Sequence, residues 1–175
     1  LAGKINGTEP FNWVGSAESL EHNFTNTVTR MGGDGLNQAE LDSLEVFVRK
    51  HLVAPPNPNN GEVLTESQQK GKELFYHPEV GCSECHSGEA LTDGKNYDVG
   101  TMSKTEKAIM TKDGSQELLL NTPSLKGLFY SGPYLHDGSA QTLFDVLNIT
   151  ATSMGHSATL TGQQQVDLVN YMLTL

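Results

Sequence analysis

The chain is poor in cysteine, in basic residues and in long apolar runs. Only two of its 175 residues are cysteine, which excludes a multi-bridge disulfide scaffold and a single-chain zinc site with three or four cysteine ligands. Its 11 Lys and Arg against 21 Asp and Glu give a formal net charge of −10, which opposes binding to the phosphate backbone of a nucleic acid. No run approaches the roughly 18 consecutive apolar residues that a membrane span needs. We therefore expect an acidic globular chain of one domain or slightly more.

Both cysteines lie in the segment Cys82-Ser83-Glu84-Cys85-His86, the C-x-x-C-H pattern of covalent c-type haem attachment. On one helical turn the two sulfurs face the same side and can bond one porphyrin, while the next imidazole reaches the iron. A redox-active dithiol, a structural disulfide and half of a metal site are the alternatives. The dithiol lacks the preceding strand and following long helix of such motifs, and a zinc site lacks a second ligand pair. The motif predicts one covalent haem c with His86 as an axial ligand.

The second axial ligand sets what the iron can do, because a thioether raises the reduction potential and a second imidazole lowers it. The candidates are Met102, Met110, Met154, His136 and His156. We favour Met154, since it lies in an irregular polar stretch between a helix expected to begin near Ser139 and another expected to begin at Thr161. His156 is the alternative. Met102 and Met110 belong to a segment rich in Lys and Thr that we expect to be a surface loop.

Capping signals and apolar faces predict an all-α fold. The segments Thr65–Gln68 and Thr161–Gln164 are capping boxes that begin helices over 65–76 and 161–175. Gly71 marks a close helix crossing. No segment shows the sustained alternation of apolar and polar residues that predicts a strand, so we expect only helices. We expect the two helices to pack across each other with the haem beneath them.

An internal repeat links the two ends of the chain. A shift of 123 residues aligns positions 10–20 with 133–143, and five of these eleven positions are identical. The same shift takes Met31-Gly32 to Met154-Gly155. Residues 1–54 are therefore predicted to be the C-terminal half of a first cytochrome-like domain whose haem-bearing half lies upstream, with Met31 as the ligand of that haem. The alternative is a simple helical extension in which Met31 only fills space.

Proline and asparagine mark the domain boundary. The run from Ala54 to Gly61 contains three prolines and three asparagines, which predicts a stiff linker over 55–64. Before the linker, Asn37 followed by Glu40 caps a helix. The haem-binding domain then covers residues 65–175.

The haem motif and two further segments, 121–127 (Asn-Thr-Pro-Ser-Leu-Lys-Gly) and 132–139 (Gly-Pro-Tyr-Leu-His-Asp-Gly-Ser), resemble the haem domains of the bacterial dihaem cytochrome c peroxidase and MauG-like family. The match is strong over about two thirds of the chain. It implies a class I cytochrome c-like domain. It also implies that a set of residues lies around the haem, namely Pro123, Leu125, Lys126, Tyr134 and His136.

Two features depart from or extend this resemblance. Lys126 stands where the family often has arginine, so a haem propionate would meet a point charge in place of a bidentate fork. The resemblance further implies an interdomain calcium ion near Ser131 and Pro133, although the sequence has no acidic cluster that requires one. For His136 we weigh a hydrogen-bonding or electron-path residue beside the haem against a turn residue satisfied by backbone groups.

Three functions compete for such a domain. Electron transfer through a six-coordinate haem is favoured; peroxidase or related oxidative catalysis needs an open distal position and a proton relay; a gas sensor would exchange an axial ligand. The resemblance implies a periplasmic or other extracytoplasmic location and a hydrogen peroxide-reducing oxidoreductase as the parent protein. The negative charge favours a redox partner with a basic face, beside the upstream haem-bearing domain or chain.

Overall fold

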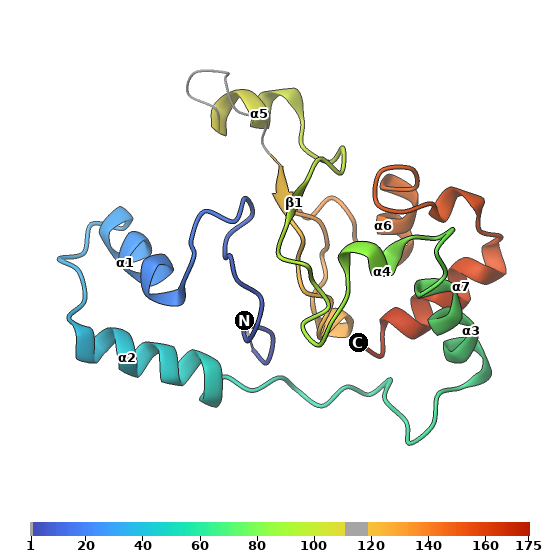
Figure 1. Ribbon diagram of the computed structural model, residues 1–175, viewed down its shortest axis with the longest axis horizontal. Helices are drawn as coiled ribbons and strands as arrows, with labels where there is room; N and C mark the ends of the chain where they lie inside the picture. Colours follow the sequence, from blue (N-terminus) through green and yellow to red (C-terminus); the bar gives the residue numbers. More distant parts are fainter. Residues whose placement is uncertain (1, 111–118) are drawn as a thin grey trace.

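The computed structural model describes residues 2–110 and 119–175, without the side chains of 108–110. In Figure 1 the blue N-terminal part with α1 and α2 lies on one side, and α3, α4, α6 and α7 lie on the other. The linker runs along the base between them. The elements are α1 (Leu20–Arg30), α2 (Gln38–Val46), the π-helical turn η1 (Phe47–His51), α3 (Glu66–Phe75), α4 (Cys82–Cys85), β1 (Asn96–Tyr97), α5 (Lys104–Met110), β2 (Leu120–Asn121), the 3₁₀ turns η2 (Leu128–Tyr130) and η3 (Ser157–Thr159), α6 (Leu143–Ile149) and α7 (Gly162–Met172).

The predicted crossing of two helices is confirmed. Capping boxes at Thr65 and Thr161 begin α3 and α7. At the crossing, a Cβ on Gly71 would lie 1.9 Å from the carbonyl oxygen of Asp167, so only glycine allows this approach. The resulting core of the second half gathers around Phe75 and Leu168, which are both fully buried.

The sequence repeat is also a repeat of backbone structure. The bridge between Phe11 and Ala17 has its counterpart, 123 residues later, in the bridge between Tyr134 and Ala140. Gly15 and Gly138, related by the same shift, both adopt positive φ, 65° and 71°. A second apolar core of Ile5, Phe11, Ala17, Leu20 and Val48 belongs to the first half. Residues 2–54 therefore form a packed unit that follows the turn and helix pattern of the C-terminal part.

Two details differ from the sequence expectations. Where a purely helical chain was expected, β1 and β2 pair antiparallel over two residues each, because the segments before and after α5 lie side by side and share backbone hydrogen bonds such as that from the Thr122 amide to the Lys95 carbonyl oxygen. The helix expected near Ser139 begins at Leu143, since Thr142 and Asp145 form a capping box at that point. Within the described residues, no helix is long and apolar enough to cross a membrane.

Candidate haem site

A single helical turn presents both cysteines. Gly81 adopts the left-handed conformation (φ 76°) immediately before α4, and the His86 amide donates to the Cys82 carbonyl oxygen at 3.1 Å to close the turn. Both thiols are free and half-buried. Two free sulfurs on one turn, followed by an imidazole, are the arrangement that covalent attachment of a porphyrin needs.

The two thiols do not have the environment of a reactive dithiol. Burial raises the pKa of the Cys82 thiol to about 11, and burial also raises the pKa of Cys85 above its ordinary value. Redox-active cysteines have the opposite property, a lowered pKa that yields thiolate. Cys82 packs against the core that surrounds Phe75. The local chemistry therefore favours haem attachment over thiol exchange.

The side chain of His86 is oriented as an axial ligand requires. It is 7% exposed, and burial lowers its pKa against the opposing effect of hydrogen bonds to the Leu91 and Pro123 carbonyls, which favours the neutral imidazole. Its Nδ1 lies 3.3 Å from the Leu91 carbonyl oxygen, to which Nδ1–H donates. This bond leaves Nε2 as the electron-pair donor for a metal, as in most histidine-ligated centres.

The loop that carries Met154 lies against the start of the haem motif. The His156 amide donates to the Val80 carbonyl oxygen at 3.0 Å, and a Cβ on Gly155 would lie 2.5 Å from the same oxygen. Met154 is half-buried, whereas His156 is exposed. The fold thus brings the Met154 loop to the residue that precedes Gly81.

Met102 is not the surface residue that its segment suggested. Its side chain is 8% exposed. The segment that carries it is bonded to the Met154 loop, because the Ser153 hydroxyl donates to the Val99 carbonyl oxygen at 2.7 Å. Apolar burial of Met102 overrides the polar composition around it. Next to it, the buried Thr101 hydroxyl has no partner among the described atoms. The side chain of Met110 lies outside the described residues.

The remaining predicted haem-environment residues take different positions. Leu125 and Tyr134 pack against the same core as Cys82, and the Tyr134 hydroxyl donates to the Leu128 carbonyl oxygen at 2.9 Å. Lys126 is half-buried, whereas Pro123 is exposed. Leu125 and Tyr134 therefore share an apolar environment with Cys82.

His136 contacts a carboxylate and an aromatic ring from distant segments. Its Nε2–H donates to Glu106 Oε1 at 3.1 Å, which differs from the backbone partner of the turn-residue alternative. Its Nδ1 is buried and has no partner among the described residues. Trp13 meets the imidazole edge to face, with 6.3 Å between ring centroids. The 123-residue shift of the repeat aligns Trp13 with His136, but nothing in the sequence places Glu106 beside His136.

The Ser131 side chain, near the implied calcium site, is already engaged. Lys4 Nζ donates to its hydroxyl, which itself donates to the Gly127 carbonyl oxygen at 2.6 Å. The same ammonium lies 4.5 Å from the centroid of the Tyr130 ring. A calcium ion beside this side chain would meet a like charge, which is unfavourable. Within residues 2–110 and 119–175, no group of three or more His, Cys, Asp or Glu side chains could hold a metal.

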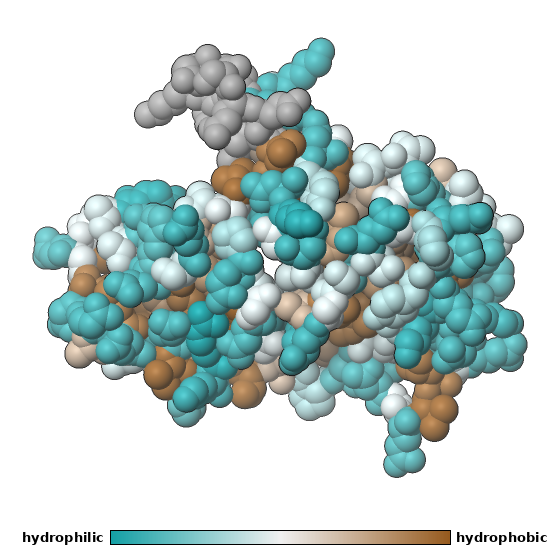
Figure 2. Space-filling model, viewed as in Figure 1, coloured by the Kyte–Doolittle hydropathy of each residue, from teal (hydrophilic) through white to brown (hydrophobic). Residues whose placement is uncertain are grey.

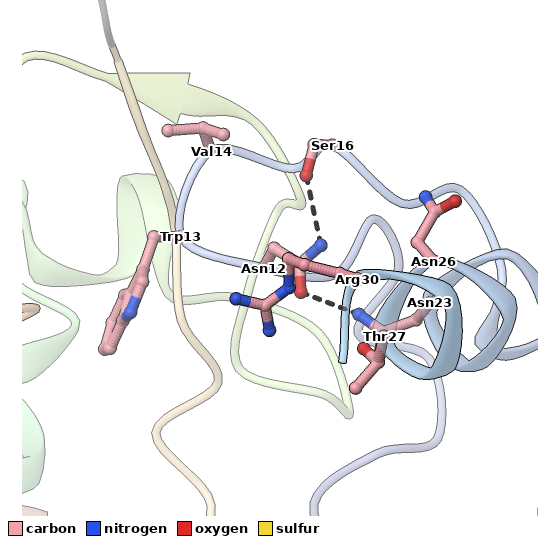
Figure 3. Close-up of a pocket in the computed structure, with 8 residues that line it drawn as sticks. All are labelled: Asn12, Trp13, Val14, Ser16, Asn23, Asn26, Thr27 and Arg30. Atoms are coloured by element: carbon pink, nitrogen blue, oxygen red, sulfur yellow. Dashed lines mark hydrogen bonds between the residues drawn. The ribbon is translucent and has the colours of Figure 1, made fainter. Parts of the chain in front are cut away.

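A surface hollow lies in the first half of the chain. Figure 3 shows it between the turn that carries Trp13 and helix α1, where Asn23 Nδ2 donates to Asn12 Oδ1 at 2.6 Å. None of the predicted haem-site residues lines it. This hollow is therefore separate from the Cys82–His86 motif.

No protein-family model matches the chain, but known proteins do. The hydrazine synthase gamma subunit of Kuenenia stuttgartiensis is 29% identical over 81% of this chain and 50% of its own length. The methylamine utilization protein MauG of Methylophilus methylotrophus is 30% identical, with 66% and 38% covered. Cytochrome-c peroxidase IdrP2 of Denitromonas iodatirespirans is 25% identical, with 66% and 41% covered. These relatives confirm the similarity of the chain to the MauG and cytochrome c peroxidase-like family.

Two solved structures share the fold of this chain. Hydrazine synthase of Kuenenia stuttgartiensis, pressurised with xenon, superposes with a TM-score of 0.75 and 25% identity over 95% of this chain and 68% of that one. A MauG-like protein associated with microbial copper homeostasis shares the fold, with a TM-score of 0.70 and 20% identity over 99% and 71%. The chain spans half or less of the length of the curated relatives described above. The comparisons therefore confirm the resemblance seen in the sequence and support a haem redox function.

Proposed function

We propose that this chain is the haem c domain of a cytochrome c peroxidase-like protein and that it transfers single electrons. Cys82 and Cys85 would hold the haem, and His86 and Met154 would be its axial ligands. When bound, the haem supplies a one-electron iron couple. The observation that carries the proposal is the buried His86, with Nδ1 bound to Leu91 and Nε2 left to donate, directly after two free cysteines on one turn.

The arrangement of the second half supports electron transfer over exchange of ligands. The Met154 loop is fixed by backbone contacts to Val80, and Met102 is buried in the neighbouring segment. Each offers a thioether, which would fill the sixth position and raise the reduction potential. The net charge of −10 favours a redox partner with a basic face. Covalent haem attachment and the relatives support an extracytoplasmic location.

The first half supports a second haem nearby. Phe47 corresponds in the repeat to Tyr171, with a shift of one residue more. Tyr171 is 6% exposed because Phe75 of α3 packs on it at 5.5 Å between ring centroids, whereas Phe47 is 51% exposed. Figure 2 shows apolar (brown) side chains at the surface of this half. We infer that residues 1–54 complete a first cytochrome-like domain whose haem-bearing helices lie upstream, and that electrons pass between its haem and the one at His86.

Peroxidase activity is the alternative function, favoured by the similarity to cytochrome-c peroxidase IdrP2. It needs an iron with an open or exchangeable distal position and a proton relay. His136 and His156 are the available imidazoles. In this reading, cyanide or carbon monoxide binds the iron at once.

Spectroscopy of the chain matured in a host that attaches haem c tests the proposal. We expect a pyridine haemochrome spectrum of haem c, an intact mass increased by one haem, and a low-spin iron that binds neither carbon monoxide nor cyanide rapidly. A Cys82→Ser, Cys85→Ser variant should carry no covalent haem, and Ser83→Ala should carry it normally. A colourless chain with two reactive thiols contradicts haem binding; a high-spin iron contradicts electron transfer and supports the peroxidase alternative.

A further inference from the structure

The turn that carries Trp13 belongs to the first repeat but accepts hydrogen bonds from residues of the haem domain. The ring itself is half exposed, and in Figure 3 it points away from Asn12, Asn23 and Arg30. The Trp13 carbonyl oxygen accepts a hydrogen bond from the Asn121 amide at 2.8 Å, and the next carbonyl, that of Val14, accepts from Asn96 Nδ2 at 3.0 Å. Both donors belong to the β1–β2 pair of the haem domain.

The two asparagines orient each other. Asn96 and Asn121 are register partners in the β1–β2 pair, and Asn121 Nδ2 donates to Asn96 Oδ1 at 3.0 Å and to the Gly94 carbonyl oxygen at 2.9 Å. With its oxygen accepting from Asn121, the Asn96 amide must turn its NH₂ group towards Val14. The close fit at Gly15, where a Cβ would lie 3.2 Å from Asn96 Oδ1, shows how tightly the turn is seated.

The segment between β1 and β2 holds the ring of His136, which contacts Trp13. Between β1 and β2 the chain forms α5, from which Glu106 accepts the Nε2–H of His136. Glu106 is itself fixed, because its Oε2 accepts from the Ser103 amide at 2.7 Å as part of a capping box. Asn96 thus anchors the Trp13 turn and Glu106 anchors the His136 ring, at the contact between the two repeats.

Residues that precede β1 and follow β2 connect this pair of strands to His86. The Leu91 carbonyl oxygen accepts from His86, and the adjacent Thr92 hydroxyl donates to the Thr122 carbonyl oxygen at 2.6 Å. Thr122 directly follows Asn121, whose amide holds Trp13. Two hydrogen bonds and short stretches of backbone therefore connect His86 to the residue that fixes the Trp13 turn.

We propose that Asn96 and Glu106 are positioning residues that fix Trp13 and His136 in edge contact, and so set the electronic coupling across the junction between the two repeats. This inference rests on the proposed electron-transfer function. It assigns the role of the β1–α5–β2 segment, which is to align the junction with the haem that His86 holds.

Trp13 is the only tryptophan of the chain, so its fluorescence reports on this junction alone. The experiment measures the anisotropy decay and lifetime of Trp13 in the haem-loaded full chain. Asn96→Asp removes the donor to Val14 while keeping the acceptor for Asn121, with Asn60→Asp on the exposed linker as the matched charge control. Loss of one such hydrogen bond should raise the population with a released turn about fivefold, with faster ring motion and a broader lifetime distribution under haem quenching.

Glu106 provides a second, independent test. Glu106→Ala should broaden the Trp13 lifetime distribution by freeing His136. Glu106→Gln keeps one of the two acceptor oxygens, which can accept from Ser103 or from His136 but not from both, and should restore only part of the wild-type signal. Glu62→Ala is the control. The haem spectrum and midpoint potential should not change in any of these variants. Wild-type anisotropy and lifetimes in both Asn96→Asp and Glu106→Ala would overturn the positioning role, even if thermal stability falls. Absence of haem from the wild-type chain would instead overturn the proposed function, which the pyridine haemochrome assay reads separately.

Discussion

The Asp167 carboxylate accepts a hydrogen bond from the Ser67 hydroxyl at 2.5 Å, across the crossing of α7 and α3. Gln163 Nε2 donates to the same oxygen at 3.1 Å, and Asn170 Nδ2 donates to Ser67 Oγ at 2.9 Å. Asp167 is buried, yet this polar group lies where the two helices approach most closely. Its hydrogen bonds satisfy the charge and fix the register of the crossing.

Stability at acidic pH should therefore depend on Asp167. The Ser67 hydrogen bond, helped by Gln163 and opposed by burial, lowers the pKa of this carboxyl. Because the folded-state pKa lies below the unfolded value of about 3.9, the contribution is present above that value and is lost as pH falls through the folded pKa. Asp167→Asn should flatten the acid limb of urea unfolding measured from pH 7 to pH 2. Asp34→Asn, on an exposed loop, should leave it unchanged, and an equal slope in both variants contradicts this assignment.

Substitution of Gly71 should be among the most damaging changes of a single methyl group. In Gly71→Ala the new Cβ would meet the Asp167 carbonyl at the helix crossing, so the helices must separate at a cost of about 3 kcal/mol. Gly162→Ala is the matched control, since no atom lies within 4 Å of its Cβ position and alanine is the better helix former. Urea unfolding of both variants measures the difference. Similar midpoints would mean that α3 and α7 do not cross at Gly71.

Local signals explain which parts of this fold could be predicted. Capping boxes at Thr65, Thr161 and Asn37 are complete within four residues, and all three helices begin where the sequence places them. The repeat was visible for the same reason, because its turn needs Gly15 and Gly138 at fixed positions. The β1–β2 pair was missed, since Asn96 and Asn121 meet only through the fold of the intervening segment.

The candidate site also divides into residues that a local sequence pattern predicts and residues that only the fold brings together. Cys82–His86 is contiguous, so its geometry follows from one helical turn. Met102 was misjudged because its neighbours in sequence are polar, whereas the tertiary fold buries it and joins Val99, three residues earlier, to the Met154 loop. Ser103 and Glu106 have the spacing of a capping box, but nothing in the sequence pairs Glu106 with His136, because only the path of α5 brings the two together.

The two methionines near the haem motif can be separated by substitution. Met154→Leu should abolish the long-wavelength charge-transfer band of ferric haem with thioether ligation and lower the midpoint potential, since the soft thioether that stabilises ferrous iron is lost. Met102→Leu conserves volume in a buried position and should cost less than about 1.5 kcal/mol without a change in the spectrum. Absorption spectra and potentiometry of the haem-loaded chain measure both. If the band is lost in Met102→Leu and kept in Met154→Leu, the ligand is Met102.

The exposed ring of Phe47, the first residue of η1, gives a test of the first domain. In this chain Phe47→Ser should cost about 1 kcal/mol or less, because the ring is only half-buried. Tyr171→Ser, at the equivalent position, should cost about 3 kcal/mol or more, since Phe75 packs against that ring. When the chain is produced with the upstream haem-bearing region that we propose, a helix equivalent to α3 would cover Phe47. The loss of unfolding free energy in Phe47→Ser should then approach that in Tyr171→Ser. An unchanged, small effect in the longer protein would mean that no helix packs on Phe47, and residues 1–54 would then be a helical extension whose exposed Phe47 has another cause.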